Sequence, residues 1–179
     1  HCRQRATDAG VSIVYSLDHL NPRQILDSRP PKLPPGALLQ HFLGYEIKSN
    51  HDVFDPDTAI LMDFRCDQSR GVHFIYCLPF TQRRALVEST LFSTSLVSKD
   101  FYDKAIRHYL ANHLSCTDYT IKRRERGVIP MVRLQQRESN LTGIGANGGA
   151  IRPSSGYAFS FIQKQIDQIS NNAKPGKPL

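Results

Sequence analysis

One glutamate stands in an apolar stretch where its carboxyl group could act as a proton donor. In "LVEST" at 86–90, Leu86 and Glu88 fall on the same face of a predicted strand, because side chains alternate along a strand. Apolar neighbours penalise the carboxylate, raise the pKa of the glutamate and keep it protonated near neutral pH. The alternative is a surface strand residue that faces Arg83 or Arg84.

A carboxylate and a guanidinium lie two residues apart in "MDFR" at 62–65. Side chains at this spacing share one face of a strand. Asp63 and Arg65 therefore form either a structural ion pair or part of a site in which they orient Glu88. The spacing alone favours the structural pair.

The segment "GIGANGGAIRPSSGYAF" at 143–159 has four glycines among its first seven residues and runs into a predicted helix. A helix N-terminus has unpaired N–H groups, and a glycine-rich approach lets an anionic or electron-rich ligand come close to them. The spacing matches neither G-x-G-x-x-G nor the P-loop pattern. A tight strand-to-helix connection is the alternative.

The chain has 179 residues, a formal net charge of +7 and a pI of about 9.4. This charge suits an anionic partner such as nucleic acid, a membrane surface or a phosphate-bearing cofactor. The basic residues are scattered, however, and the densest run, "KRRER" at 122–126, contains a glutamate, which favours a solvated strand end or turn.

Four cysteines occur without a CxxC pair or zinc-ligand spacing, so we expect reduced thiols in the cytosol and no metal site. We find neither a signal peptide nor an apolar run of about 18 residues and expect no membrane span.

The periodicity predicts a mixed α/β chain around an antiparallel sheet. Four β-rich segments indicate a four-stranded meander: 38–49, 59–66, 72–80 and 84–94. A helix is predicted over 99–114 with Ser98 as its N-cap, and two strands around Gly127 within 118–134. Shorter strands are expected in 10–20 and 24–31, and a last helix over 157–171.

Five ordered blocks together resemble the lycopene cyclases of the bacterial β-cyclase type. The glycine block "IGANGGAIRPSSGYAF" resembles a flavin-contacting motif of that family. The other four blocks are "LLQHFLGYEI" (38–47), "AILMDFR" (59–65), "FIYCLPFTQRRALVESTLFS" (74–93) and "ERGVIPM" (125–131).

The resemblance implies a Rossmann-type FAD-binding fold interrupted by an antiparallel β-sheet substrate domain, similar to the aromatic-hydroxylase flavoproteins. The implied parts are 1–35 and 136–172 for the FAD-binding domain, 36–135 for the substrate domain and 173–179 for a disordered tail. The family's dinucleotide fingerprint is not found in this sequence. We therefore expect the N-terminal FAD-binding half to be missing and the isolated fragment to be inactive.

The activity implied is flavin-dependent, non-redox cyclisation of the ψ-ends of lycopene to β-ionone rings, an isomerase step of carotenoid biosynthesis. The implied cofactor is reduced FAD, with NAD(P)H as the reductant, and the substrates are lycopene and related linear carotenes. We expect a cytoplasmic protein bound peripherally to the membrane surface, with no nucleic-acid partner.

The resemblance also implies roles for individual residues. Glu88 matches the first glutamate of an F-L-E-E-T-like motif and Ser89 replaces the second acidic residue, while Asp63 is the second catalytic candidate. The candidate flavin-binding residues are Gly145, Gly148, Gly149, Pro153, Ser155 and Gly156. The candidate substrate-binding residues are Phe80, Tyr157 and Arg65.

Two other functions remain open from the sequence. An aromatic-hydroxylase-like monooxygenase would use the same flavin fold with NAD(P)H and oxygen. A non-catalytic basic binding module would use the net positive charge instead, although no basic–aromatic platform supports it.

Overall fold

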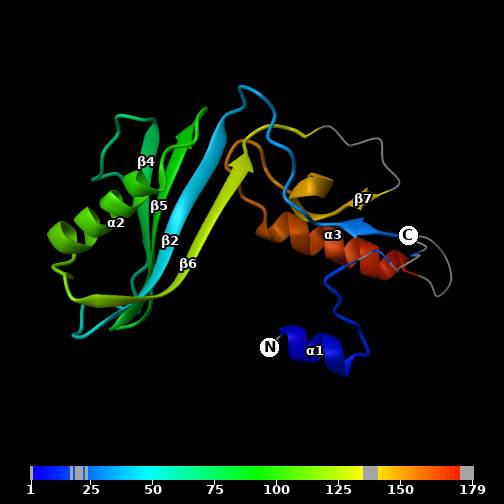
Figure 1. Cartoon of the computed structure of the whole chain (residues 1–179), viewed down its shortest axis with the longest axis horizontal. Coiled ribbons are helices and arrows are strands. Elements are labelled where there is room, and N and C mark those ends of the chain that lie inside the picture. The colour runs from blue at the N-terminus through cyan, green and yellow to red at the C-terminus, as the bar shows by residue number, and fades with distance from the viewer. Residues whose placement is uncertain (1, 17, 19–21, 23, 135–140, 174–179) are drawn as a thin grey trace.

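The computed structural model describes residues 2–16, 18, 22, 24–134 and 141–173 (Figure 1). Its largest unit is a five-stranded antiparallel sheet with the order β3-β4-β5-β2-β6. The strands are β2 (Leu39–Ser49), β3 (Ile60–Asp63), β4 (Val72–Thr81), β5 (Arg84–Ser93) and β6 (Tyr119–Pro130). The expected mixed α/β fold with an antiparallel sheet is confirmed.

The predicted four-stranded meander is wrong in its order. Strands β3, β4 and β5 follow one another as neighbours, but β2 pairs with β5 and β6 rather than with β3. The segment predicted as two strands around Gly127 is the single strand β6. A Cβ on Gly127 would lie 2.6 Å from Cζ of Phe42, so this glycine makes room for a ring on the next strand and does not mark a turn.

Helix α2 (Lys99–His113) covers one face of the sheet and closes the core, as Figure 1 shows. Its buried residues pack against the strands because they recur at helical spacing, with Ile106 and Leu110 fully buried. Ser98 is the N-cap, as predicted, but it contributes its carbonyl, which accepts from the N–H of Phe101, and no side-chain capping bond.

The chain enters and leaves this sheet through a short parallel pair. Strand β1 (Leu26–Asp27) pairs with β7 (Thr142–Gly143), so the residues between them form an insertion. The 3₁₀ turn η1 (Gly145–Gly148) and helix α3 (Phe159–Asn172) follow β7, and α1 (Cys2–Asp8) precedes β1. The strand expected within 10–20 is absent from the described residues there, and Val11 and Tyr15 are exposed.

The four cysteines are free thiols in the structure. Within the described part of the chain, no helix is long and apolar enough to cross a bilayer, and no cluster of His, Cys, Asp or Glu could hold a metal ion. The expected disordered tail beyond Ala173 lies outside the described residues.

Candidate functional site

The sheet face opposite α2, hereafter the open face, carries four cross-strand rows of side chains. Alternation along the strands places these residues on one side, because their neighbours in sequence are the ones that pack under α2. From β4 through β5 and β2 to β6, the rows are Leu78–Leu86–Glu46–Arg123, Tyr76–Glu88–Gly44–Glu125, Phe74–Thr90–Phe42–Gly127 and Val72–Phe92–Gln40–Ile129.

Glu88 stands near the centre of the open face, between Tyr76 and Gly44 in its row. Burial raises the pKa of Glu88 to about 7, and the nearby negative charge of Glu125 adds to the effect. The Thr90 hydroxyl donates a hydrogen bond to Oε1 of Glu88 at 2.8 Å, and this bond lowers the pKa of Glu88. Glu88 is therefore a carboxylic acid that can hold and release a proton near neutral pH.

The two arginines proposed as surface partners for Glu88 bind other carboxylates. Arg84 donates to Glu46, and Arg83 donates to Asp52. Among the described residues, no arginine is paired with Glu88. The predicted shared face of Leu86 and Glu88 is confirmed by the strand register.

Aromatic rings lie beside the acid on the open face. Phe74 packs edge-on against Tyr76, Phe92 and Phe64, with ring centroids 5.1, 5.4 and 5.8 Å away. Phe64 reaches this cluster from the segment after β3 and is half-exposed. Ring faces are electron-rich, so this cluster could stabilise a cation close to Glu88.

The glycine loop (residues 143–156) folds back on itself between β7 and α3. Gly145 and Gly149 have φ of +61° and +78°, and the place of a Cβ on either one is free of atoms within 4 Å. Gly143 and Gly148 instead make room for backbone, since a Cβ on Gly148 would lie 2.3 Å from the Gly143 carbonyl oxygen. The loop therefore combines close internal packing at Gly143 and Gly148 with open space beside the Cα atoms of Gly145 and Gly149.

A cavity of about 590 Å³ adjoins the loop and has walls from 146–149, Ile151, Pro153 and the segment after β6. Three of the six predicted flavin-binding residues line it: Gly148, Gly149 and Pro153. Its size suits a ring system of a bound cofactor.

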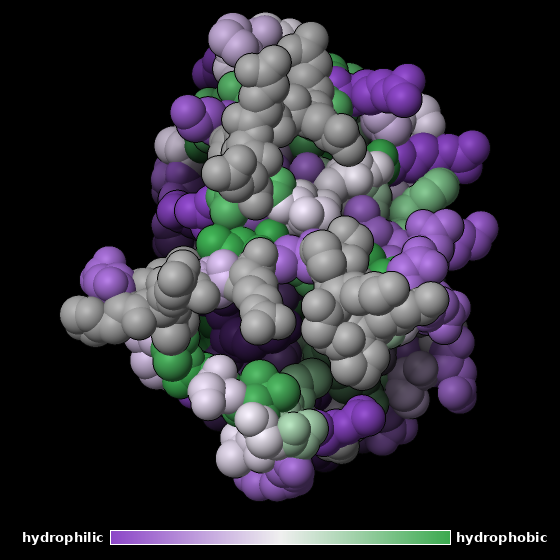
Figure 2. Space-filling view, turned by 90° about the vertical axis from the view of Figure 1, so that its right-hand side faces the viewer, coloured by the Kyte–Doolittle hydropathy of each residue, from purple (hydrophilic) through white to green (hydrophobic). Residues whose placement is uncertain are grey.

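The end of the glycine loop meets the open face at Gln40. A Cβ on Gly156 would lie 1.9 Å from Oε1 of Gln40, so only glycine allows this approach. That oxygen is buried and has no hydrogen-bond donor among the described residues. Gln40 pairs with Phe92, four residues from Glu88 along β5, which places the acid about 13 Å from this junction. Figure 2 views the molecule from the side on which β7 and α3 lie, and apolar and polar side chains are interspersed there.

Asp63 lies on the other side of the sheet from Glu88. It pairs in register with Ile75 and accepts hydrogen bonds from Arg65 and from the hydroxyl of Tyr109 on α2, at 2.7 Å. The Arg65 guanidinium holds the pKa of Asp63 far below its usual range. The structure therefore contains the ion pair that the spacing favoured and does not bring Asp63 or Arg65 to Glu88.

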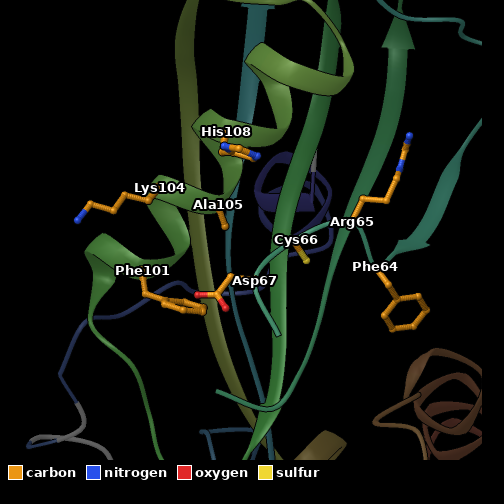
Figure 3. Close-up of a pocket in the computed structure, with 8 residues that line it drawn as sticks. All are labelled: Phe64, Arg65, Cys66, Asp67, Phe101, Lys104, Ala105 and His108. Carbon is orange, nitrogen blue, oxygen red and sulfur yellow. The ribbon is translucent and has the colours of Figure 1, made fainter. Parts of the chain in front are cut away.

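The other predicted substrate contacts are exposed and apart from the acid. Phe80 lies at the end of β4 under the Arg84 guanidinium, 5.6 Å from ring centroid to carbon, and Tyr157 precedes α3. Arg65 borders a cavity of about 520 Å³ beside α2. Around this cavity Phe101 and Asp67 lie close to each other, while Arg65 and Lys104 point in opposite directions (Figure 3).

Sequence reasoning missed the residues that complete the neighbourhood of Glu88. These are Thr90, Gly44 and Glu125 around the acid and Gln40 at the junction with the glycine loop. Only Thr90 could be found from local spacing, since it lies two residues from Glu88 on the same strand. The others become neighbours through strand order.

Comparison with known proteins gives a consistent result. Residues 4–175 match the family model described as lycopene cyclase protein. A lycopene beta-cyclase of a Paracoccus species is 28% identical over 76% of this chain and 36% of its own length. The chloroplastic and chromoplastic lycopene beta cyclase of Narcissus pseudonarcissus is 30% identical over 66% of this chain and 26% of its own.

A solved structure has a similar fold. It is a geranylgeranyl bacteriochlorophyll reductase-like protein from Thermoplasma acidophilum, with a TM-score of 0.52 and 15% identity over 79% of this chain and 36% of that one. The chain thus spans about a third of the bacterial relative and about a quarter of the plant relative.

Proposed function

Because the chain belongs to the lycopene cyclase family, we propose that it supplies the acid and part of the flavin site of a lycopene β-cyclase. The observation that carries the proposal is Glu88, a carboxylic acid with a pKa of about 7 on an aromatic sheet face. A proton donor beside electron-rich rings is what protonation of an alkene requires.

The reaction proposed for this face is an isomerisation in which protons balance. Glu88 transfers its proton to a carbon of the terminal double bond of the polyene, and the electron pair of that double bond forms the new C–H bond. A neighbouring alkene attacks the resulting carbocation and closes the ring. A proton then leaves the ring carbon and returns to the Glu88 carboxylate, so no net oxidation occurs.

The chain's own residues have defined tasks in this scheme. Tyr76 and Phe92, which pack against the buried ring of Phe74, exclude water and face the cation. Thr90 orients the Glu88 carboxyl group through its hydrogen bond. The absence of a guanidinium partner among the described contacts of Glu88 favours its protonated form.

The glycine loop fits the flavin that the family resemblance implies. The open space beside Gly149 and the adjoining cavity, which Gly148, Gly149 and Pro153 line, support binding of FAD there. Gly145, Ser155 and Gly156 are proposed to contact it from the rest of the loop. Reduced FAD, kept reduced by NAD(P)H, would supply electron density for a cationic intermediate. Helix α3, whose N-terminal N–H groups carry no side-chain cap, would favour negative charge on that ligand.

We further propose that an additional FAD-binding part completes the protein and that lycopene and related linear carotenes are its substrates. The shorter span relative to the curated relatives supports the first point. Peripheral attachment to an anionic membrane surface is proposed because the carotenes reside in the bilayer and the chain carries a net charge of +7.

The test expresses the whole open reading frame that encodes these residues in cells that accumulate lycopene. Pigments are separated by chromatography for the wild type, Glu88→Gln and a matched control, Glu46→Gln, which changes a neighbouring glutamate on the open face. Cyclic carotenes should form with the wild type and the control but fall at least a hundredfold with Glu88→Gln.

Flavin absorbance and a thermal unfolding scan show whether each variant is folded and loaded. Full conversion by a folded Glu88→Gln variant would remove Glu88 from the acid role. No conversion by a flavin-loaded wild type, with NAD(P)H consumption matched to an oxygenated product, would replace the cyclase by a monooxygenase.

A further inference from the structure

A second glutamate faces Glu88 across a residue that has no side chain. Glu88, Gly44 and Glu125 occupy one row of the open face on β5, β2 and β6. Two strand spacings separate the backbones of the glutamates by about 9.5 Å. The place of a Cβ on Gly44 lies 3.0 Å from Cγ and 3.4 Å from Oε1 of Glu125, so Glu125 leans over Gly44 towards Glu88.

We propose that Glu125 is a positioning residue whose carboxylate, facing Glu88 across Gly44, keeps the proton on Glu88 until substrate arrives. Glu125 replaces in space the second acidic residue that the sequence motif lacks, since Ser89 stands at that position and faces α2, where its hydroxyl meets Nε2 of His73. This assignment rests on the proposed function of Glu88 as the acid.

The other charged groups of the open face pair mainly with one another and not with Glu88. Arg123 donates to Oε2 of Glu125 at 2.8 Å, and its side chain is 62% exposed, so water screens much of its charge. Glu46 on β2 is held between Arg84 of β5 and Arg123 of β6. From β4, Tyr76 faces Glu88. Burial raises the pKa of the Tyr76 phenol, and the negative charge of Glu88 raises it further.

The physical role follows from the placement of two carboxyl groups in one row of the open face. An ionised Glu125 disfavours a second negative charge nearby, which adds to the burial of Glu88 and holds it as an acid. Gly44 matters because a methyl group there would occupy the space through which the carboxyl groups face each other. Substrate bound on the open face would exclude water and strengthen the interaction.

The direct test titrates the carboxyl groups without relying on activity. In the protein from the whole open reading frame, selective ¹³C labelling of glutamate side chains gives carboxyl NMR signals, and single substitutions of Glu46, Glu88, Glu125 and Glu138 assign those of these residues. Glu125→Gln should lower the titration midpoint of Glu88 by about 1. Glu125→Asp keeps the charge and should move it much less, as should Glu46→Gln.

An unchanged midpoint in folded Glu125→Gln would overturn the proposal, and so would an equal fall in Glu46→Gln or Glu125→Asp. The pH profile of carotene cyclisation, measured on the protein from the whole open reading frame, separates this inference from the proposed function. If Glu88 is the acid, the alkaline limb moves to lower pH with the midpoint. If the midpoint falls while the limb stays, Glu125 controls Glu88 but another group protonates the substrate.

Discussion

Replacement of Glu88 by glutamine should make the chain more stable at neutral and alkaline pH. An ordinary glutamate titrates near 4.5, and burial raises the pKa of Glu88 in the folded chain to about 7. At 1.36 kcal/mol for each pKa unit, the difference amounts to about 3 kcal/mol. Glutamine keeps the shape and the oxygen that accepts from Thr90 but cannot ionise.

The sign follows from proton linkage. The folded pKa lies above the unfolded value, so the protonated acid stabilises the fold fully below about pH 4.5, and this contribution is lost as the pH rises through 7. The free energy of unfolding of Glu88→Gln minus that of the wild type should therefore be near zero at pH 4 and approach about 3 kcal/mol above pH 8.

The difference between the two chains is the useful quantity, because two buried histidines titrate in the same window. Burial lowers the pKa of His41 and of His73, so each loses stability as the pH falls below its unfolded value near 6.5, opposite to Glu88. Subtraction removes both contributions, which are common to the two chains.

The assay is urea unfolding followed by far-ultraviolet circular dichroism between pH 4 and 8.5, since the chain has no tryptophan. Glu46→Gln serves as the control for the loss of a glutamate elsewhere on the open face. A Glu88→Gln difference that does not change between pH 4 and 8.5 would refute the argument that burial keeps Glu88 protonated.

Three further predictions concern the parts that hold the open face in place. Gly127→Ala should cost about 1–3 kcal/mol, because its methyl would lie 2.6 Å from Phe42, and Phe42→Leu should recover part of this loss in urea unfolding. Tyr109→Phe should lower the free energy of unfolding by about 1.5 kcal/mol at pH 7 through loss of its bond to Asp63, with no effect on the titration of Glu88. Cys77, whose thiol pKa burial raises to about 12, should react with a thiol-specific reagent only after unfolding, as mass spectrometry can show.

The sequence was sufficient for features that depend on neighbours along the chain. The limits of α2, the face shared by Leu86 and Glu88, and the ion pair of Asp63 with Arg65 all follow from periodicity of 3.6 or 2 residues. Gly145 and Gly149 occupy left-handed backbone, which glycine adopts at little cost.

Features that depend on strand order could not be predicted in this way. A meander would have placed β2 next to β3, whereas β2 lies between β5 and β6 and so brings Gly44 beside both Glu88 and Glu125. The interior glycine of β6 was misread for a related reason, since the ring that needs its space comes from β2, 85 positions earlier. The roles of Gly44 and Gly127 are therefore determined by residues on neighbouring strands and not by residues adjacent in sequence.

The position after Glu88 shows why a motif in sequence can mislead about chemistry in space. Adjacent strand residues point to opposite faces, so a carboxylate at position 89 would lie under α2 against His73, not beside the Glu88 carboxyl group on the open face. Ser89 is hydrogen-bonded to the buried His73, and the negative charge that raises the pKa of Glu88 is that of Glu125 on β6. The loss of the second acidic residue from the motif therefore removes nothing from the open face, because the strand that could supply a second carboxylate is the one that reaches over Gly44.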